Sequence, residues 1–234
     1  MFLYDWTFFI LIPPLILAMW AQSKVKQNYT KYSKVQSRKG YTGEQVAKEL
    51  LRLNGITDVK VDRVNGHLTD HYDPRSKTIR LSQDIYSSTS VSALSIAAHE
   101  TGHALQHHKN YAPLTLRSNL VPIVNLGSNL AMPLFMLGIF LAAFAGSPFG
   151  QELMLFGIIL FTTVVAFQVV TLPVEFDASK RAITMLEQNG YLESNEIKPA
   201  KEVLNAAALT YVAAVATTLA SLLRLILIYS RNKR

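Results

Sequence analysis

Two histidines four residues apart, with a glutamate directly after the first, are the residues of this chain whose types and spacing best fit metal chemistry. They lie in the pentad His99-Glu100-Thr101-Gly102-His103. Because residues four apart share one face of an α-helix, His99 and His103 can bind one metal ion while Glu100 faces a water molecule at that metal. The pentad therefore predicts a centre with one Zn²⁺ per chain, at which Glu100 is the catalytic base.

The residues around the pentad predict the helix that this spacing requires. Four hydroxyl residues at 87–90 can cap a helix, and residues 91–108 contain no proline and no glycine apart from Gly102. The pentad segment is also rich in small side chains, which would let another helix approach the metal closely. These are Ala97, Ala98, Gly102 and Ala104.

A third metal ligand has to come from elsewhere in the chain, because a catalytic zinc takes three protein ligands and keeps one position open. The longer motif H-E-x-x-H-x-x-G-x-x-H is absent, since Gln106 and Lys109 stand where its glycine and last histidine would be. The Asn-Pro-Asp-Gly-like segment of intramembrane site-2 proteases is absent from the sequence as well. A glutamate from a downstream helix remains, and Glu175 is the best candidate.

Glu175 lies near the start of a second predicted helix, which has Pro173 in its first turn and ends before Gly190. It shares one face of this helix with three small residues, Ala178, Ser179 and Ala182. An alternative interpretation is that Glu175 only stabilises the helix N-terminus electrostatically. Asp177 lies off that face and has the spacing of a salt bridge with Arg181.

The composition is that of a membrane protein. Half of the 234 residues are hydrophobic and 17% are charged. Four segments, at about 3–21, 120–145, 153–172 and 203–228, are apolar and long enough to cross about 30 Å of hydrocarbon. The net charge of +7 does not indicate nucleic acid as a partner, because the basic residues concentrate beside apolar segments. The absence of cysteine excludes disulfides and thiolate metal sites.

We therefore expect a predominantly α-helical multi-pass membrane protein with about four transmembrane helices and a small α+β catalytic region. An uncleaved N-terminal anchor at 1–22 precedes a soluble region at 23–118, with a helix at 43–54 and strands at 59–64 and 78–82. The second strand could offer an exposed edge to an extended peptide, or serve only as scaffold. The rest is expected to form a transmembrane hairpin, a helix with the third ligand, and a fourth transmembrane segment with a basic tail, at 119–173, 174–202 and 203–234.

Basic residues predict the orientation of these segments. Residues 22–40 contain six lysines and arginines and no acidic residue, whereas the loop at 146–152 has no basic residue. The positive-inside rule places residues 22–118 in the cytoplasm and the N-terminus outside. The three basic residues at 231–234 disagree with this orientation, because four crossings would leave them outside. Either the fourth segment does not fully span the membrane, or the six basic residues at 22–40 outweigh these three. We expect a bacterial plasma membrane protein whose zinc site lies at the cytoplasmic surface.

Three stretches make the chain resemble the YugP-like membrane zinc metallopeptidases, and the resemblance covers nearly its whole length. They are GHLTDHYDP at 66–74, AHETGHA at 98–104 and LPVEFDAS at 172–179. More distantly, the chain is similar to the HtpX and CAAX-type membrane proteases, whose zinc is held by H-E-x-x-H and a later glutamate.

This resemblance implies zinc ligation by His99, His103 and Glu175, with Glu100 as general base. The chain departs from the distant relatives at one position. They carry an aspartate four residues after the ligating glutamate, where it supports a ligating histidine, and this chain carries Ser179 there. Ser179 and the nearest acid, Asp177, are therefore the candidates for supporting a ligand.

The group that would stabilise the oxyanion of the transition state stays open. The candidates are His71, Tyr72, His107, Arg117, Tyr211 and Arg224. A solvated helix end also explains His107, and Arg224 could extend from its helix to the membrane surface. An arginine in an apolar segment is nevertheless a functional candidate by default.

The function predicted is that of a membrane-bound zinc metalloendopeptidase of the gluzincin type, acting on membrane proteins or membrane-adjacent peptides. The alternative is a non-proteolytic, zinc-stabilised membrane scaffold or chaperone. The intact Glu100 argues against that alternative, because a structural zinc site needs no general base. A transporter is disfavoured, since the apolar segments contain no chain of ionisable residues.

Overall fold

The computed structural model describes residues 6–144 and 146–232 of the chain. The chain forms two compact units, which we call the helical unit and the mixed unit. The helical unit comprises Met1–Trp20, Leu116–Leu172 and Tyr211–Arg234, and the mixed unit comprises Ala21–Thr115 and Pro173–Thr210.

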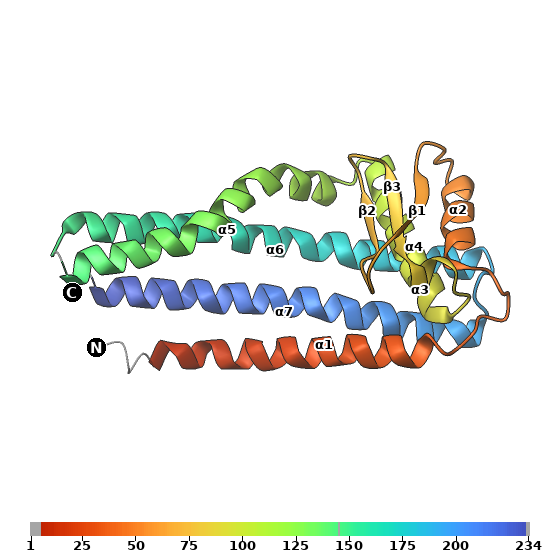
Figure 1. The fold of residues 1–234 in the computed structure, drawn as a ribbon, viewed down its shortest axis with the longest axis horizontal. Helices are drawn as coiled ribbons and strands as arrows, with labels where there is room; N and C mark the ends of the chain where they lie inside the picture. The colour runs from red at the N-terminus through yellow and green to blue at the C-terminus, as the bar shows by residue number, and fades with distance from the viewer. Residues whose placement is uncertain (1–5, 145, 233–234) are drawn as a thin grey trace. The chain divides into compact units, whose positions relative to one another are not determined.

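Four long helices account for most of the chain (Figure 1). Each is long and apolar enough to cross a membrane, the first together with the short 3-10 helix η2 that precedes it. The predicted class, a mainly helical multi-pass membrane protein, is thereby confirmed. The bounds are Trp6–Leu11 for η2, Ile12–Tyr32 for α1, Ala112–Phe144 for α5, Pro148–Gln188 for α6 and Ser194–Asn232 for α7.

Within the helical unit, α5 and α6 form the predicted hairpin. Gly146, which has a φ of +58°, lies in the connection between them. The two helices then approach so closely that a Cβ on Gly138 would stand 2.6 Å from the carbonyl oxygen of Gly150. A side chain of any size at Gly138 would force the helices apart.

The predicted break between the third span and the helix of Glu175 is wrong. Pro173 lies inside α6, which continues to Gln188, so Glu175 is far from any helix N-terminus. A proline in a helix interior costs about 3 kcal/mol, and here the packing of its buried neighbours Val174 and Ala178 offsets that cost. The predicted end of this helix before Gly190 is confirmed, since α6 ends at Gln188. The remainder of the segment 174–202 contains the start of α7 at Ser194.

The mixed unit contains a three-stranded sheet with the strand order β1-β3-β2. The strands are β1 (Lys60–Val64), β2 (His71–Asp73) and β3 (Thr78–Ser82). β3 pairs in parallel with β1 and antiparallel with β2. Of the two interpretations of residues 78–82, the structure supports the scaffold strand, because β3 is the central strand of the sheet. The strand β2, which the sequence analysis missed, is an edge strand.

Three shorter helices complete the mixed unit: α2 (Gly43–Leu53), α3 (Gln83–Tyr86) and α4 (Val91–His108). A capping box between Thr42 and Gln45 starts α2. Buried apolar residues of α2, β1, β3 and α4 share one hydrophobic core with residues 182–204. This core fixes α4, and with it the pentad, against the final part of α6.

Candidate metal centre

The helix α4 carries the pentad as its spacing predicts. Its N-cap is Ser90, whose Oγ accepts a hydrogen bond from the backbone N–H of Ala93 at 3.2 Å. From there α4 runs without interruption to His108. His99 and His103 therefore lie on one face, with ring centroids 4.7 Å apart in an edge-to-face arrangement.

Glu175 meets both histidines, although it lies more than 70 residues further along the chain. Its Oε2 is 3.3 Å from Nε2 of His99 and 3.4 Å from Nε2 of His103. The Glu175 side chain is 3% exposed and those of His99 and His103 are 14% and 12% exposed. The ligand atoms of the three residues all lie within 4.8 Å of one another.

This geometry fits a zinc ion. Tetrahedral zinc with bonds of about 2.0–2.1 Å to nitrogen and oxygen places neighbouring ligand atoms roughly 3.3–3.4 Å apart. The two distances from Glu175 Oε2 agree with that separation. Two histidines and one carboxylate are also a ligand set that catalytic zinc uses, with one coordination position left for water or substrate.

A hydrogen bond from a neighbouring side chain orients His103. Its Nδ1 lies 3.0 Å from Oε1 of Gln106. Nε2 of Gln106 donates to the backbone oxygen of Val174 at 2.7 Å and to Oδ2 of Asp177 at 2.8 Å. These two acceptors fix the orientation of the amide, so Oε1 of Gln106 must accept a hydrogen bond from Nδ1–H of His103. Nε2 of His103 is then left as the metal-binding nitrogen.

His99 is supported by the residue that replaces the relatives' aspartate. Oγ of Ser179 lies 3.1 Å from Nδ1 of His99, which leaves Nε2 of His99 toward Glu175. Asp177 forms the ion pair that its spacing predicted, with Nε of Arg181 2.5 Å from its Oδ2. Asp177 therefore contacts the site through Gln106, and Ser179 contacts it directly.

Gln106 is the site residue that the sequence analysis did not recognise. It was considered only as a residue that breaks the longer zinc motif. Its position three residues after His103 was a usable signal, because residues three apart also share a helix face. Its side chain is fully buried, which agrees with a role in holding other side chains.

Glu100 also lies on α4, but it does not belong to the group of three possible metal ligands, His99, His103 and Glu175. It is 7% exposed. Nearby, Asp70 accepts hydrogen bonds from the backbone N–H and Oγ of Ser82, and burial together with the charge of Glu100 raises the pKa of Asp70. For His103, burial favours the neutral ring, but the adjacent carboxylate of Glu175 outweighs burial and raises the pKa of His103.

Two candidates for transition-state support come from β2, and they differ in their surroundings. The hydroxyl of Tyr72 lies 2.8 Å from Nδ1 of His107, one helical turn beyond His103. Burial raises the pKa of Tyr72 to about 12, so this hydroxyl keeps its proton at neutral pH. His71 is exposed, and its Nδ1 lies 2.8 Å from the backbone oxygen of Thr69.

Arg224 belongs to the helical unit, whereas every residue of the three-residue group belongs to the mixed unit. Its Nε donates to Oγ1 of Thr7 at 3.4 Å, and its guanidinium lies 6.0 Å from the centroid of the Phe8 ring. Within its own unit, Arg224 therefore contacts η2.

Comparison with known proteins agrees with this centre. Residues 7–230 match a family described as "putative neutral zinc metallopeptidase". The chain is 47% identical over 225 residues to the "putative membrane protease YugP" of Bacillus subtilis (strain 168). The aligned region covers 96% of this chain and 97% of that protein. No solved structure matches the chain. Together with the three-residue group, the family match identifies the cofactor as zinc.

Proposed function

Because the chain belongs to this family of neutral zinc metallopeptidases, we propose that it is a gluzincin-type endopeptidase that cleaves membrane proteins or membrane-adjacent peptides. Protease function in general follows from the family. The observation that carries the finer proposal is the approach of one buried Glu175 oxygen to Nε2 of both His99 and His103. It supports a centre with three protein ligands and Glu100 outside the ligand set.

Different residues of the chain have different roles in the proposed reaction. Zinc at this position supplies Lewis-acid chemistry, since it polarises a peptide carbonyl and makes water more acidic. His99, His103 and Glu175 hold the metal. The carboxylate of Glu100 accepts a proton from the attacking water and later gives it to the nitrogen of the leaving amine. Gln106 and Ser179 keep the two imidazoles in the ligating orientation.

The proposed substrate class rests on where the ligands lie along the chain. Glu175 follows Leu172, the last residue of that part of the helical unit, by three residues, or roughly 4.5 Å of helix rise. His103 precedes α5 by nine residues. A site attached at both ends to membrane-spanning helices favours substrates that are themselves in or near the membrane.

The substrate class is tested by comparing the membrane proteins of cells that carry the wild type and a Glu100→Gln variant. We expect membrane proteins to accumulate uncleaved with the variant. Glu187→Gln is the matched control, since Glu187 is exposed on the same helix as Glu175, and it should behave as wild type. Equal processing by wild type and Glu100→Gln would support the scaffold or chaperone alternative instead.

The side of the membrane follows from the basic residues at 22–40, and we propose that the zinc site faces the cytoplasm. The sequence has no cysteine, so single cysteines give labelling without background. Lys39→Cys, at an exposed position, and Ser147→Cys, in the α5–α6 connection, should react with impermeant reagents from opposite sides. Labelling of both from one side would contradict the orientation.

A further inference from the structure

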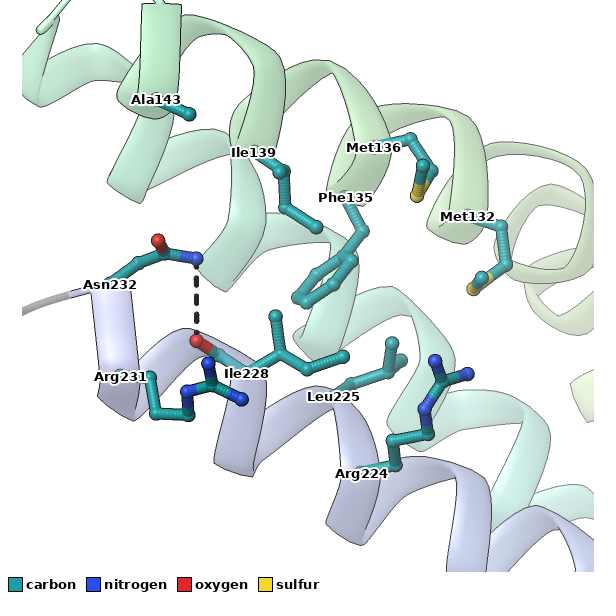
Figure 2. Close-up of a pocket in the computed structure, with 10 residues that line it drawn as sticks. All are labelled: Met132, Phe135, Met136, Ile139, Ala143, Arg224, Leu225, Ile228, Arg231 and Asn232. Atoms are coloured by element: carbon teal, nitrogen blue, oxygen red, sulfur yellow. Dashed lines mark hydrogen bonds between the residues drawn. The ribbon is translucent and has the colours of Figure 1, made fainter. Parts of the chain in front are cut away.

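The helical unit has a cavity between α5 and α7 that the zinc chemistry does not use (Figure 2). Its volume is about 350 Å³, which is within the usual range of small-ligand sites, about 300–1,000 Å³. The α5 wall is entirely apolar, and Met132, Phe135 and Met136 form much of it. Methionine side chains are flexible and polarisable, so this wall can adapt to a flexible hydrocarbon chain.

The α7 wall combines apolar residues with two arginines, Arg224 and Arg231. Figure 2 shows Arg231 beside Ile228 and Arg224 beside Leu225. Asn232 lies next to Arg231 at the end of the described helix, where its Nδ2 donates to the backbone oxygen of Ile228 at 3.4 Å. Residues seven apart lie on the same side of a helix, and the two Cα atoms are roughly 10 Å apart along its axis. One guanidinium therefore lies at the end of the apolar segment and the other about two turns further into it.

The charge of the helical unit is strongly one-sided. Its described residues include three arginines and a single acidic residue, Glu152. Two of the three arginines line this cavity. A ligand that satisfies both walls needs a hydrocarbon chain and an anionic head, because a neutral apolar molecule would not use the guanidiniums and a free anion would not use the apolar wall.

We propose that this cavity binds an anionic phospholipid. An acyl chain lies along the apolar wall of α5, and Arg231 together with the second amide hydrogen of Asn232 binds the phosphate. Arg224, deeper in the span, donates to the ester carbonyl oxygens from its terminal guanidinium nitrogens, because its Nε donates to Thr7. The proposal also gives a local role to the basic end of the chain, whose charge disagrees with the positive-inside orientation. It does not depend on the protease reaction.

The test uses the full-length chain in a neutral detergent. The probes are phosphatidylglycerol and phosphatidylcholine with identical acyl chains, and glycerol 1-phosphate as a head without chains. Binding is measured by native mass spectrometry across a lipid titration. We expect the wild type to bind phosphatidylglycerol about tenfold or more tightly than phosphatidylcholine and to bind glycerol 1-phosphate far more weakly.

The variants separate the two arginines. Arg231→Gln should weaken both lipids, because both carry the phosphate, and should remove the preference for phosphatidylglycerol, because only phosphatidylcholine offsets the phosphate charge with a choline cation. Arg224→Gln should weaken both lipids to a similar extent, because their ester carbonyls are identical. Arg117→Gln is the matched control, since Arg117 lies in the same unit over the ring of Phe167 and does not line the cavity. Met136→Trp, which fills the cavity, should weaken the binding of both lipids. This variant tests the site independently of the arginine variants, should one of those fail to fold.

Several results would overturn the proposal. Equal binding of the two lipids by the wild type would contradict selection of a net anionic headgroup. An affinity for phosphatidylglycerol, or an anionic preference, that survives Arg231→Gln would contradict Arg231 as the residue that binds the phosphate. Tight binding of glycerol 1-phosphate would indicate a site for soluble phosphate esters. A wild-type dimer that Met136→Trp dissociates would show that a second copy of the chain occupies the cavity.

Discussion

Gly102 of α4 and Ala178 of α6 approach so closely that a Cβ on Gly102 would stand 2.7 Å from the carbonyl oxygen of Ala178. Ala178 is fully buried, three residues after Glu175 and directly before Ser179. This contact therefore sets the separation at which Glu175 and Ser179 reach His99 and His103. A glycine inside the pentad thus has a geometric function, which is to let α6 deliver the third ligand.

Gly102→Ala should destabilise the fold and weaken zinc binding. Alanine has a better helix propensity than glycine by about 1 kcal/mol, so an unhindered site would gain stability. Here the new methyl group meets backbone, which cannot rotate away, and overpacking costs typically about 1–3 kcal/mol. Thermal unfolding and zinc titration measure the two effects. His108→Ala, at the exposed end of α4, is the control, and a more stable Gly102→Ala protein would contradict the close contact.

Gln106→Leu should weaken zinc binding about 10- to 100-fold, because the nitrogen of His103 that faces away from the metal loses its hydrogen-bond acceptor. Ser179→Ala should have the same kind of effect through His99. Ser179→Asp, which restores the acid of the distant relatives, should recover affinity. Competition with a chromogenic chelator measures the zinc dissociation constants.

The matched control for Gln106→Leu is Gln83→Leu, since Gln83 is exposed at the start of α3. Wild-type zinc affinity in Gln106→Leu and Ser179→Ala, both folded, would show that the two hydrogen bonds do not position the ligands.

The stability gained from zinc should shrink as the pH falls from about 8 to about 6. Glu175 raises the pKa of His103 in the metal-free protein. A histidine whose folded pKa is raised contributes stability that is fully present below the unfolded value of about 6.5 and lost as the pH rises through the folded pKa. Acidification therefore stabilises the metal-free protein, while protons compete with zinc for His103.

The measurement is the difference in melting temperature between zinc-loaded and chelator-treated protein at several pH values. Zinc at 1,000 times its dissociation constant adds about 4 kcal/mol to the free energy of unfolding. The difference in melting temperature at pH 8 should therefore be several degrees. Glu175→Gln serves as the control, because it removes both a ligand and the cause of the raised pKa, and it should show little response to chelator. A wild-type difference that grows on acidification would contradict the proposed pairing.

Local patterns in the sequence were enough to predict α4, two of the three strands and the helical conformation around Glu175. The hydroxyl residues at 87–90 and the uninterrupted run to His108 predicted α4, and the alternation at residues 59–64 and 78–82 predicted β1 and β3. Glu175 could be found because its helix presents small residues on one face. All of these signals lie within a few residues of the feature that they predict.

The features that were missed depend on contacts between distant residues. Gln106 holds His103 by means of Val174 and Asp177, which are 68 and 71 residues away. Pro173 was expected to begin a helix, because proline prefers the first turn of a helix. The packing that offsets the cost of a proline in a helix interior is not visible in the sequence. The central place of β3 depends on β2, which has only three residues and too short a pattern to recognise.

The most direct test of the account is zinc content and peptide hydrolysis measured on the same preparations of the wild type, Glu100→Gln and Glu175→Gln. The account predicts that Glu100→Gln keeps one zinc per chain and loses hydrolysis by roughly 10²- to 10⁴-fold, the usual contribution of a general base. Glu175→Gln should lose both zinc and hydrolysis. A Glu100→Gln protein with wild-type hydrolysis, or a Glu175→Gln protein with unchanged zinc affinity, would contradict the account.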